Sequence, residues 1–160
     1  MLLLTQRLLL AILKQAYRQV PTELRILKRT LAWFNSLYLP EIEQKDWLQC
    51  ELALAEGLTN AIRHAHRDKP PETPIDLEVT VDDQQIILRI WDAGAPFSLQ
   101  QYLREQADPM NTHAGGGRGL VILQKIADVL EYNRTEDQRN CLLIVKQYSR
   151  ANETCDEETC

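Results

Sequence analysis

The sequence lacks the cysteine and histidine patterns of stapled or zinc-binding proteins. Its four cysteines, at positions 50, 141, 155 and 160, form no CxxC pair, and none of its three histidines stands at metal-ligand spacing. We therefore expect neither a zinc site nor a disulfide framework. Free thiols in a reducing cytoplasm are the simplest interpretation of these residues.

Glycine and proline are also scarce. The 160 residues include six glycines and seven prolines, with 44% hydrophobic and 26% charged residues and no internal repeat. This composition excludes a collagen-like or disordered chain and is typical of a soluble globular protein. Because one domain usually takes about 100 to 200 residues, we expect one domain and no second catalytic domain.

No hydrophobic run is long enough for a membrane span. The first thirteen residues, MLLLTQRLLLAIL, are apolar at ten positions but are interrupted by Thr5, Gln6 and Arg7, and a span needs about 20 apolar residues. They lack a basic lead-in and an A-x-A site, so we expect no signal peptide. We interpret residues 1–19 as an N-terminal extension that packs locally. A membrane-touching or dimerising helix is the alternative.

The chain has little net charge outside its C-terminal end. Four of its 23 acidic residues lie in the last eight positions, so the remainder carries 18 basic and 19 acidic side chains. We treat 149–160 as an acidic tail. A nearly neutral body argues against direct nucleic-acid binding, which requires a basic face to replace counterions. The basic charge is concentrated near the front, where residues 1–30 hold six basic side chains and only Glu23 as an acid.

Hydrophobic periodicity predicts an α+β protein. A three- and four-residue period favours helices over about 22–38, about 43–66 and a segment that includes Leu120, Leu123, Ala127 and Leu130. Alternation favours strands over 75–81 and 86–90, paired as a hairpin, and a last strand over about 141–148. The stretch 93–117 shows no periodicity. The order predicts a two-layer α/β sandwich with helices on one face of a mostly antiparallel mixed sheet.

The predicted second helix places polar side chains opposite its apolar face. Glu56, Asn60 and Arg63 fall within about 60° of one another on a helical wheel. They face away from the side that carries Leu54 and Leu58. A functional site and an ordinary solvent-facing surface both fit this pattern.

Asp92 ends the predicted hairpin on its apolar side. Alternation puts its carboxylate on the face of Ile86, Leu88 and Ile90, where an unpaired charge would be costly. It must find donors, either the N–H groups of the Ala93-Gly94 turn or the amino group of a ligand.

A glycine-rich segment precedes the third predicted helix. Four of the six glycines lie between positions 115 and 119. Free N–H groups at a helix start favour phosphate. A flexible connector is the alternative interpretation.

Together these three places resemble the N, G1 and G2 boxes of the GHKL ATP-binding superfamily, whose fold is the Bergerat fold. Glu56-Gly57-Leu58-Thr59-Asn60-Ala61 with Arg63-His64 resembles the N box. Asp92-Ala93-Gly94-Ala95-Pro96 resembles G1, and Gly115-Gly116-Gly117-Arg118-Gly119-Leu120 resembles G2. The glutamate four residues before the asparagine resembles the bacterial anti-sigma factor serine/threonine kinases of partner-switching systems. The resemblance covers about residues 20–148.

The resemblance implies roles for individual residues. Asn60 would hold Mg²⁺, Glu56 would be the catalytic base, and Asp92 would accept the adenine amino group. Gly94 would let the adenine approach, and Arg63 and Arg118 would offer positive charge to the phosphates. The other implied nucleotide-binding residues are Pro96, Gly115, Gly116, Gly117, Gly119 and Leu120. The segment 97–114 would be a lid over the nucleotide.

Two positions depart from the pattern of the family. Asn140-Cys141 stands where many relatives have Gly-Thr, which would change one ligand contact. Gly57 replaces a more usual alanine and should weaken its helix by about 0.5 to 1 kcal/mol.

The resemblance implies a cytoplasmic, Mg-ATP-dependent serine/threonine protein kinase and anti-sigma factor. It would phosphorylate a STAS-type anti-sigma factor antagonist, sequester a sigma factor and form a homodimer. Arg25, Lys28 and Arg29 on the first predicted helix would dock an acidic partner, although a solvated charged face is equally compatible.

Other functions stay open at this point. One is an ATP-binding regulatory or adaptor module that binds its partner without phosphorylating it. A histidine-kinase catalytic fragment would need a phosphoacceptor helix, which the three histidines do not offer. An ATPase of the chaperone or mismatch-repair type would need a further transducer domain.

Overall fold

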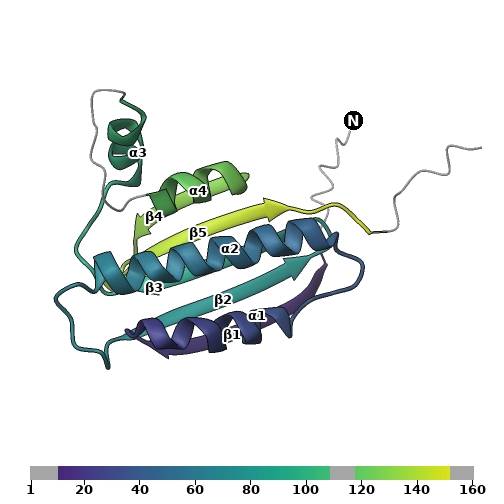
Figure 1. Cartoon of the computed structure of the whole chain (residues 1–160), viewed down its shortest axis with the longest axis horizontal. Coiled ribbons are helices and arrows are strands. Elements are labelled where there is room, and N and C mark those ends of the chain that lie inside the picture. The colour runs from purple at the N-terminus through teal and green to yellow at the C-terminus, as the bar shows by residue number, and fades with distance from the viewer. Residues whose placement is uncertain (1–10, 109–117, 152–160) are drawn as a thin grey trace, which may run out of the picture.

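The computed structural model describes residues 11–108 and 118–151. Their strands form one sheet in the order β1-β2-β3-β5-β4, with every neighbouring pair antiparallel. The strands are β1 (Ile12–Pro21), β2 (Pro74–Asp82), β3 (Gln85–Asp92), β4 (Val129–Arg134) and β5 (Asn140–Gln147). The helices are η1 (Leu24–Ile26), α1 (Leu27–Asn35), α2 (Gln44–Asn60), η2 (Ala61–Ala65), α3 (Leu99–Ala107) and α4 (Arg118–Ile126). Helices α1, α2 and α4 lie on one face of the sheet (Figure 1), which confirms the expected two-layer α+β sandwich.

The β2–β3 hairpin forms as its alternating sequence predicts. Val79 pairs with Leu88 and Val81 with Ile86, so the apolar side chains of both strands point to the helix layer. The Asp82 carboxylate closes the turn by accepting the N–H groups of Gln84 and Gln85, both at 2.8 Å.

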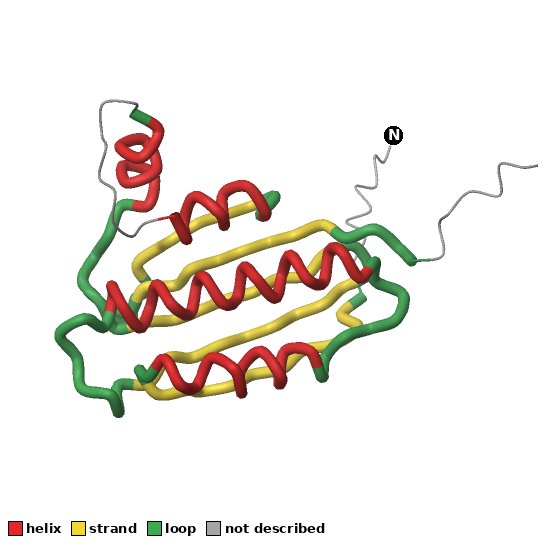
Figure 2. The backbone as a smooth tube through the Cα atoms, viewed as in Figure 1, coloured by secondary structure: helices red, strands yellow, loops and turns green. Residues whose placement is uncertain are grey.

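Helix α2 runs along the middle of the sheet (Figure 2) and packs against β3 and β5. Leu54 and Leu58 are fully buried on its inner face. Gly57 allows the close approach, because a Cβ there would lie 2.6 Å from Ile90 Cδ1 and 3.1 Å from Leu142 Cδ2. The departure from alanine therefore has a packing reason.

Residues 12–21, which the sequence analysis placed mostly in an N-terminal extension, form edge strand β1. The strand pairs with β2 along its length, from Ile12 opposite Asp82 to Pro21 opposite Pro74. Only its last part is covered: Val20 is 2% exposed, whereas Tyr17 is 66% exposed. Because one edge and much of one face are open, its sequence shows little hydrophobic alternation, and periodicity missed it.

Both long helices predicted from the sequence are divided in the structure. The first begins as the 3₁₀ turn η1 and becomes α-helical over α1 only. The second is α-helical to Asn60 and then widens into the π-helical turn η2, in which His66 N donates to Ala61 O at 2.8 Å. An i→i+5 bond shifts every later side chain around the axis, so α-helical angles do not hold beyond Asn60.

Two further elements differ from the sequence-based expectation. The stretch 93–117 was expected to be irregular, but it contains α3, whose first turn is capped by Ser98 Oγ accepting Gln101 N at 3.3 Å. Leu130 was expected on the third helix, but α4 ends at Ile126 and Leu130 lies in β4. Directly before that strand, the backbone N–H of Asp128 donates to Val145 O at 2.8 Å.

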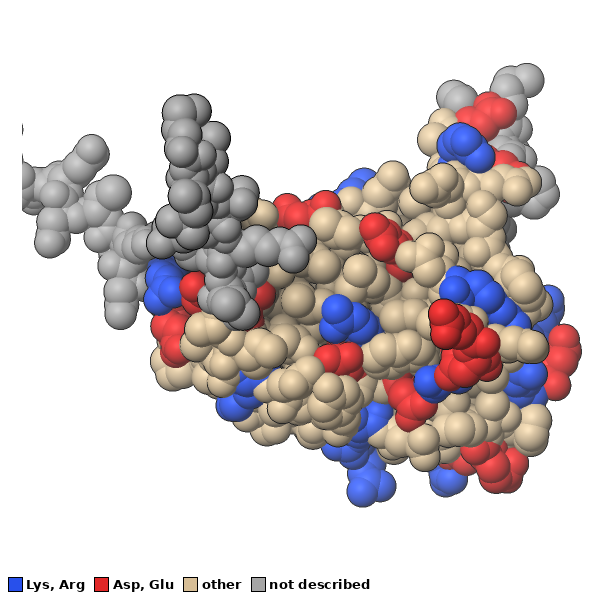
Figure 3. Space-filling model, turned by 180° about the vertical axis from the view of Figure 1, so that it is seen from behind, with Lys and Arg blue, Asp and Glu red and all other residues tan. Residues whose placement is uncertain are grey.

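The other face of the sheet is turned away from the helices. Figure 3 shows this side, where charged side chains of both signs are interspersed among uncharged ones. Glu78 joins β1 to β2 there, because its carboxylate accepts Gln15 Nε2 at 2.8 Å and Tyr17 Oη at 3.4 Å. Within the described ranges, no helix is long and apolar enough to cross a membrane.

The C-terminal end of the described chain packs against the loop before α2. Most of the acidic tail 149–160 lies outside the described residues, as do Cys155 and Cys160. Residues 149–151 pair with the loop before α2, where Ser149 O accepts Glu43 N and Ala151 N donates to Glu41 O, both at 2.9 Å. Cys50 and Cys141 are free thiols.

Candidate functional site

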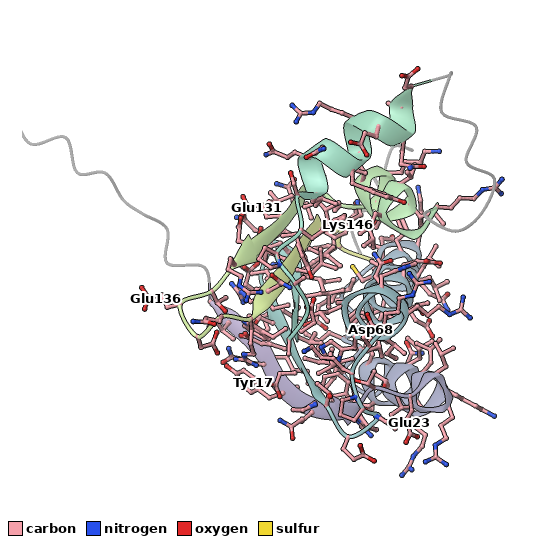
Figure 4. All side chains as sticks on the ribbon, turned by 90° about the vertical axis from the view of Figure 1, so that its left-hand side faces the viewer. Tyr17, Glu23, Asp68, Glu131, Glu136 and Lys146 are labelled. Atoms are coloured by element: carbon pink, nitrogen blue, oxygen red, sulfur yellow. The ribbon has the colours of Figure 1, made fainter. Side chains whose placement is uncertain are left out.

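One end of the sandwich contains a cavity of about 560 Å³. It lies where the end of α2, the end of β3 and the start of β5 meet, at the left-hand edge of Figure 1. Figure 4 views this end directly, with the sheet on one side and the helix layer on the other. Of the residues implied by the resemblance, Asn60, Asp92, Pro96 and Leu120 line the cavity. The fold thus brings the N box, G1 and the end of G2 to one place.

Asp92 is 2% exposed and accepts hydrogen bonds from three donors. Its Oδ1 accepts Gly94 N and Asn140 Nδ2, both at 2.8 Å, and its Oδ2 accepts the Tyr132 hydroxyl at 2.5 Å. The expectation that this carboxylate points into the apolar side and needs donors is confirmed. A carboxylate has about four acceptor positions, so one further donor can still bind at Oδ2.

Tyr132 was not singled out from the sequence. Burial and the hydrogen bond to Asp92 raise the pKa of its hydroxyl, which therefore stays a donor at neutral pH. Its ring also lines the cavity and meets Phe97 edge-on, with centroids 5.7 Å apart. Phe97 in turn contacts Tyr102 of α3 at 5.6 Å. An aromatic cluster thus connects Asp92 to the first helix of the implied lid.

Gly94 packs against the end of the N-box helix. A Cβ at this position would lie 2.8 Å from both Cβ and O of Ala65. Its carbonyl accepts Arg134 Nη1 at 2.8 Å and Asn140 Nδ2 at 3.2 Å. The space that glycine leaves open is filled by η2, which gives Gly94 a packing role beside the one implied for a ligand.

Glu56 and Asn60 lie one turn apart on α2, and both are half-buried. Asn60 lines the cavity, whereas Glu56 does not. Glu56 faces the start of α4, since its Oε2 is 2.6 Å from where a Cβ of Gly119 would be. Because Gly119 has no side chain, the Glu56 carboxylate can occupy this position without a steric clash.

The basic side chains at the cavity are not the ones that the α-helical wheel predicts. Arg63 is exposed and is not among the cavity-lining residues, because η2 changes the helical spacing after Asn60. Arg67 and Lys69 line the cavity instead, together with Asp68 and His64. Arg118 is exposed at the first turn of α4. Gly115, Gly116 and Gly117 lie outside the described residues.

No cluster of three or more potential metal ligands among His, Cys, Asp and Glu occurs in the part of the chain that the structure describes. A divalent cation here would depend on the Asn60 amide oxygen and on oxygens of a bound ligand. This is the shared coordination that Mg²⁺ accepts in phosphate sites. The donor set therefore fits a metal that arrives with its nucleotide.

The fold and this site define an α+β sandwich domain of the histidine kinase-like ATPase type. The model of the histidine kinase-like ATPase domain family matches residues 20–146, and the chain belongs to this family.

A curated relative and a solved structure are similar to this chain. It is 24% identical over 103 residues to the serine-protein kinase RsbW of Oceanobacillus iheyensis, a match that covers 61% of this chain and 63% of that protein. The crystal structure of the RsbU and RsbW domains of a Mycobacterium tuberculosis protein superposes with a TM-score of 0.59 at 12% identity, covering 86% of this chain and 33% of that one. The structural match shows the fold. Together these findings confirm the resemblance drawn from the three boxes.

Proposed function

We propose that this chain is a cytoplasmic, Mg-ATP-dependent serine/threonine protein kinase and anti-sigma factor. Its substrate would be a STAS-type anti-sigma factor antagonist in a partner-switching system, and its second partner a sigma factor. The observation that carries this proposal is the pair Glu56 and Asn60, one turn apart on α2, beside a cavity that Asn60 and Asp92 line. Similarity to the serine-protein kinase RsbW supports the same activity.

The cavity suits a nucleotide in size and chemistry. Its volume of about 560 Å³ falls in the usual range of about 300 to 1,000 Å³ for ligand sites. The free acceptor position of Asp92 would take an exocyclic amino group, which adenine has at its edge. Ala61, Ala65 and Leu142 offer apolar surface to the base.

The phosphates would lie toward Asn60 and the start of α4. Mg²⁺ held by the Asn60 amide oxygen would neutralise charge on the phosphate oxygens. Arg118 and the first N–H groups of α4 would add positive potential, and Arg63 would need to turn inward to contribute. Of the described cations, Arg67 and Lys69 are the ones already at the cavity.

Glu56 is the proposed base. Its carboxylate would accept the proton of a serine hydroxyl as the serine oxygen bonds to the γ-phosphorus. The bond to the β-phosphate oxygen then breaks and ADP leaves with that electron pair. Such a base must reach the hydroxyl directly or through one water.

The test is phosphotransfer from labelled ATP to a STAS-type antagonist. Glu56→Gln should keep nucleotide affinity and lower transfer at least about 100-fold, in the range of a lost general base. Glu51→Gln is the matched control, since Glu51 is on the same helix but bonds Asn35 of α1. Undiminished transfer by Glu56→Gln would refute the assigned base.

One observation favours a second candidate, an ATP-binding regulatory or adaptor module that does not phosphorylate its partner. Glu56, the proposed base, does not line the cavity. An adaptor would bind ATP and the antagonist normally but leave no phosphoserine on it. The same labelled-ATP assay distinguishes the two candidates.

We also propose a homodimer and a docking face for the antagonist. Arg25, Lys28 and Arg29 are all exposed on η1 and α1, where Arg25 is ion-paired with Glu23. For the dimer, the exposed apolar side chains on the edge strands offer contact area: Ile12, Leu13 and Tyr17 on β1 and Val129 on β4. Sedimentation of the full chain would test the dimer.

A further inference from the structure

A buried histidine connects three separate segments behind the cavity. His66 follows η2 directly and is 1% exposed. Its Nε2 is 2.7 Å from Ala93 N, and its Nδ1 is 2.7 Å from Thr22 Oγ1. Thr22 lies between β1 and η1, and Ala93 directly follows Asp92. None of the proposed chemistry uses this ring.

The contacts determine which ring nitrogen carries the proton. Ala93 N is a backbone amide and can only donate, so Nε2 must be the unprotonated acceptor. The Thr22 hydroxyl donates to Thr73 O at 2.7 Å, which leaves Oγ1 free to accept. Nδ1 therefore carries the proton and donates it to Thr22. This single arrangement satisfies the Thr22 hydroxyl, both ring nitrogens of His66 and the backbone amide of Ala93.

We propose that His66, held as its Nδ1–H tautomer by Thr22, is the positioning residue for the Ala93-Gly94 turn that presents Asp92 to a nucleotide base. The inference rests on the proposed nucleotide site. His66 itself touches no ligand in this arrangement. It acts through the Ala93 N–H, next to the Gly94 N–H that the Asp92 carboxylate accepts.

The hydrogen bond from Ala93 N to His66 Nε2 requires a neutral imidazole ring. A protonated imidazole has N–H groups on both nitrogens, so Nε2 would point a donor at the Ala93 donor. Burial lowers the pKa of His66 from its ordinary 6.5, the nearby Asp92 opposes this shift, and Lys69 adds to it. Because the folded-state pKa is lowered, the stabilisation is complete above about pH 6.5 and is lost as the pH falls below it.

The first measurement needs no nucleotide. The ¹⁵N shifts of the His66 ring, assigned with His66→Gln as the blank, should show a protonated Nδ1 and an unprotonated Nε2 at pH 7.5. Thr22→Val removes the acceptor for Nδ1–H and should speed amide exchange at Ala93 and Gly94 about tenfold, the factor of one lost hydrogen bond. Thr22→Ser keeps the hydroxyl and should restore the normal rate.

Thr30 offers a matched control. Thr30 is buried, and its hydroxyl, like that of Thr22, donates to a backbone carbonyl, Ile26 O at 3.0 Å, but it lies within α1. Thr30→Val should leave exchange at Ala93 and Gly94 unchanged.

The second measurement is ATP affinity between pH 7.5 and 5.5. We expect the affinity of the unaltered chain to fall only as the pH drops below the lowered pKa of the folded-state His66 ring. We expect Thr22→Val to weaken the affinity about tenfold at pH 7.5. A ring protonated on Nε2 at pH 7.5, or Thr22→Val exchange equal to that of the unaltered chain, would overturn the inference. If the unaltered chain binds no ATP, the proposed function fails, while the ring signature and exchange rates still decide the role of His66.

Discussion

At the scale of single residues, the Asp92 side chain at the cavity is oriented by donors of the protein itself. Asp92 receives donors from its own turn, from β4 through Tyr132 and from β5 through Asn140. Three donors from three segments fix the orientation of this buried carboxylate. A binding partner then meets an oriented acceptor and need not pay for ordering it.

Tyr132 should contribute to stability through this carboxylate. Tyr132→Phe keeps the ring and removes the hydroxyl, so we expect it to lower the free energy of unfolding by about 2 kcal/mol, the usual size for a hydrogen bond to a charged group. Tyr148→Phe is the control, because its hydroxyl donates to the neutral Asp82 carbonyl at 2.8 Å and should cost about 1 kcal/mol. Urea unfolding of both variants measures the difference. Equal losses of unfolding free energy would contradict the claim that the hydrogen bond to the Asp92 carboxylate is the stronger one.

The sequence predicted some of these residues and not their partners. Alternation along 86–92 was enough to put Asp92 on the buried side and to require donors for it. Tyr132 and His66 were not predicted because their hydrogen-bond partners are distant in the sequence. Asp92 is 40 residues from Tyr132, and Ala93 is 27 residues from His66. Only the pairing of β4 with β5 and the packing of η2 bring them together. Asn140 was noticed solely as a departure from the family.

At the scale of elements, Gly57 determines how closely α2 approaches the sheet. Helix propensity alone predicts that Gly57→Ala stabilises the protein by about 0.5 to 1 kcal/mol. The contact of 2.6 Å that a Cβ would make with Ile90 Cδ1 predicts the opposite sign, because overpacking usually costs about 1 to 3 kcal/mol.

We expect Gly57→Ala to be destabilised by about 1 kcal/mol in urea unfolding. Ala32→Gly, at an exposed site of α1, reports the intrinsic difference between the two residues in a helix. A stabilised Gly57→Ala protein would mean that the Ile90 side chain moves aside without cost.

Element prediction succeeded where a segment has one apolar and one polar face. The β2–β3 hairpin and the core of α2 show the clear periods of two and 3.6 that such a division produces. The prediction missed strand β1 because much of it is open to solvent. It missed the short edge strand β4 because Leu130 continues the apolar spacing of α4. The π-helical turn η2 has no propensity signal, yet it moves Arg63 away from the cavity-lining set.

At the scale of the whole molecule, the distribution of charge bears on partners more than on the fold. Exposed Arg25, Lys28 and Arg29 lie together on η1 and α1. If they dock the antagonist, reversing all three charges should lower the association rate and flatten its salt dependence. Lys125→Glu on α4 is the control for a general loss of positive charge. Stopped-flow association at two ionic strengths measures both, and an unchanged rate would leave these residues as a solvated face.

The overall architecture and the family could be predicted from the sequence. The N, G1 and G2 boxes in a fixed order are more specific than any one of them alone. The family match over residues 20–146 confirms that joint interpretation. Partner identity is not encoded in the same way. It depends on surface shape and charge, which vary among chains that share this fold.

The most direct test of a Mg-ATP site is calorimetry of ATP binding with and without Mg²⁺, for the unaltered chain and for Asp92→Asn. The amide keeps the shape of the side chain but replaces an acceptor with a donor at the position proposed for the adenine amino group. We expect ATP binding that Mg²⁺ strengthens and that Asp92→Asn abolishes while its thermal unfolding remains cooperative. Equal ATP affinity of the two proteins, or no binding by the unaltered chain at millimolar ATP, would contradict the proposed site.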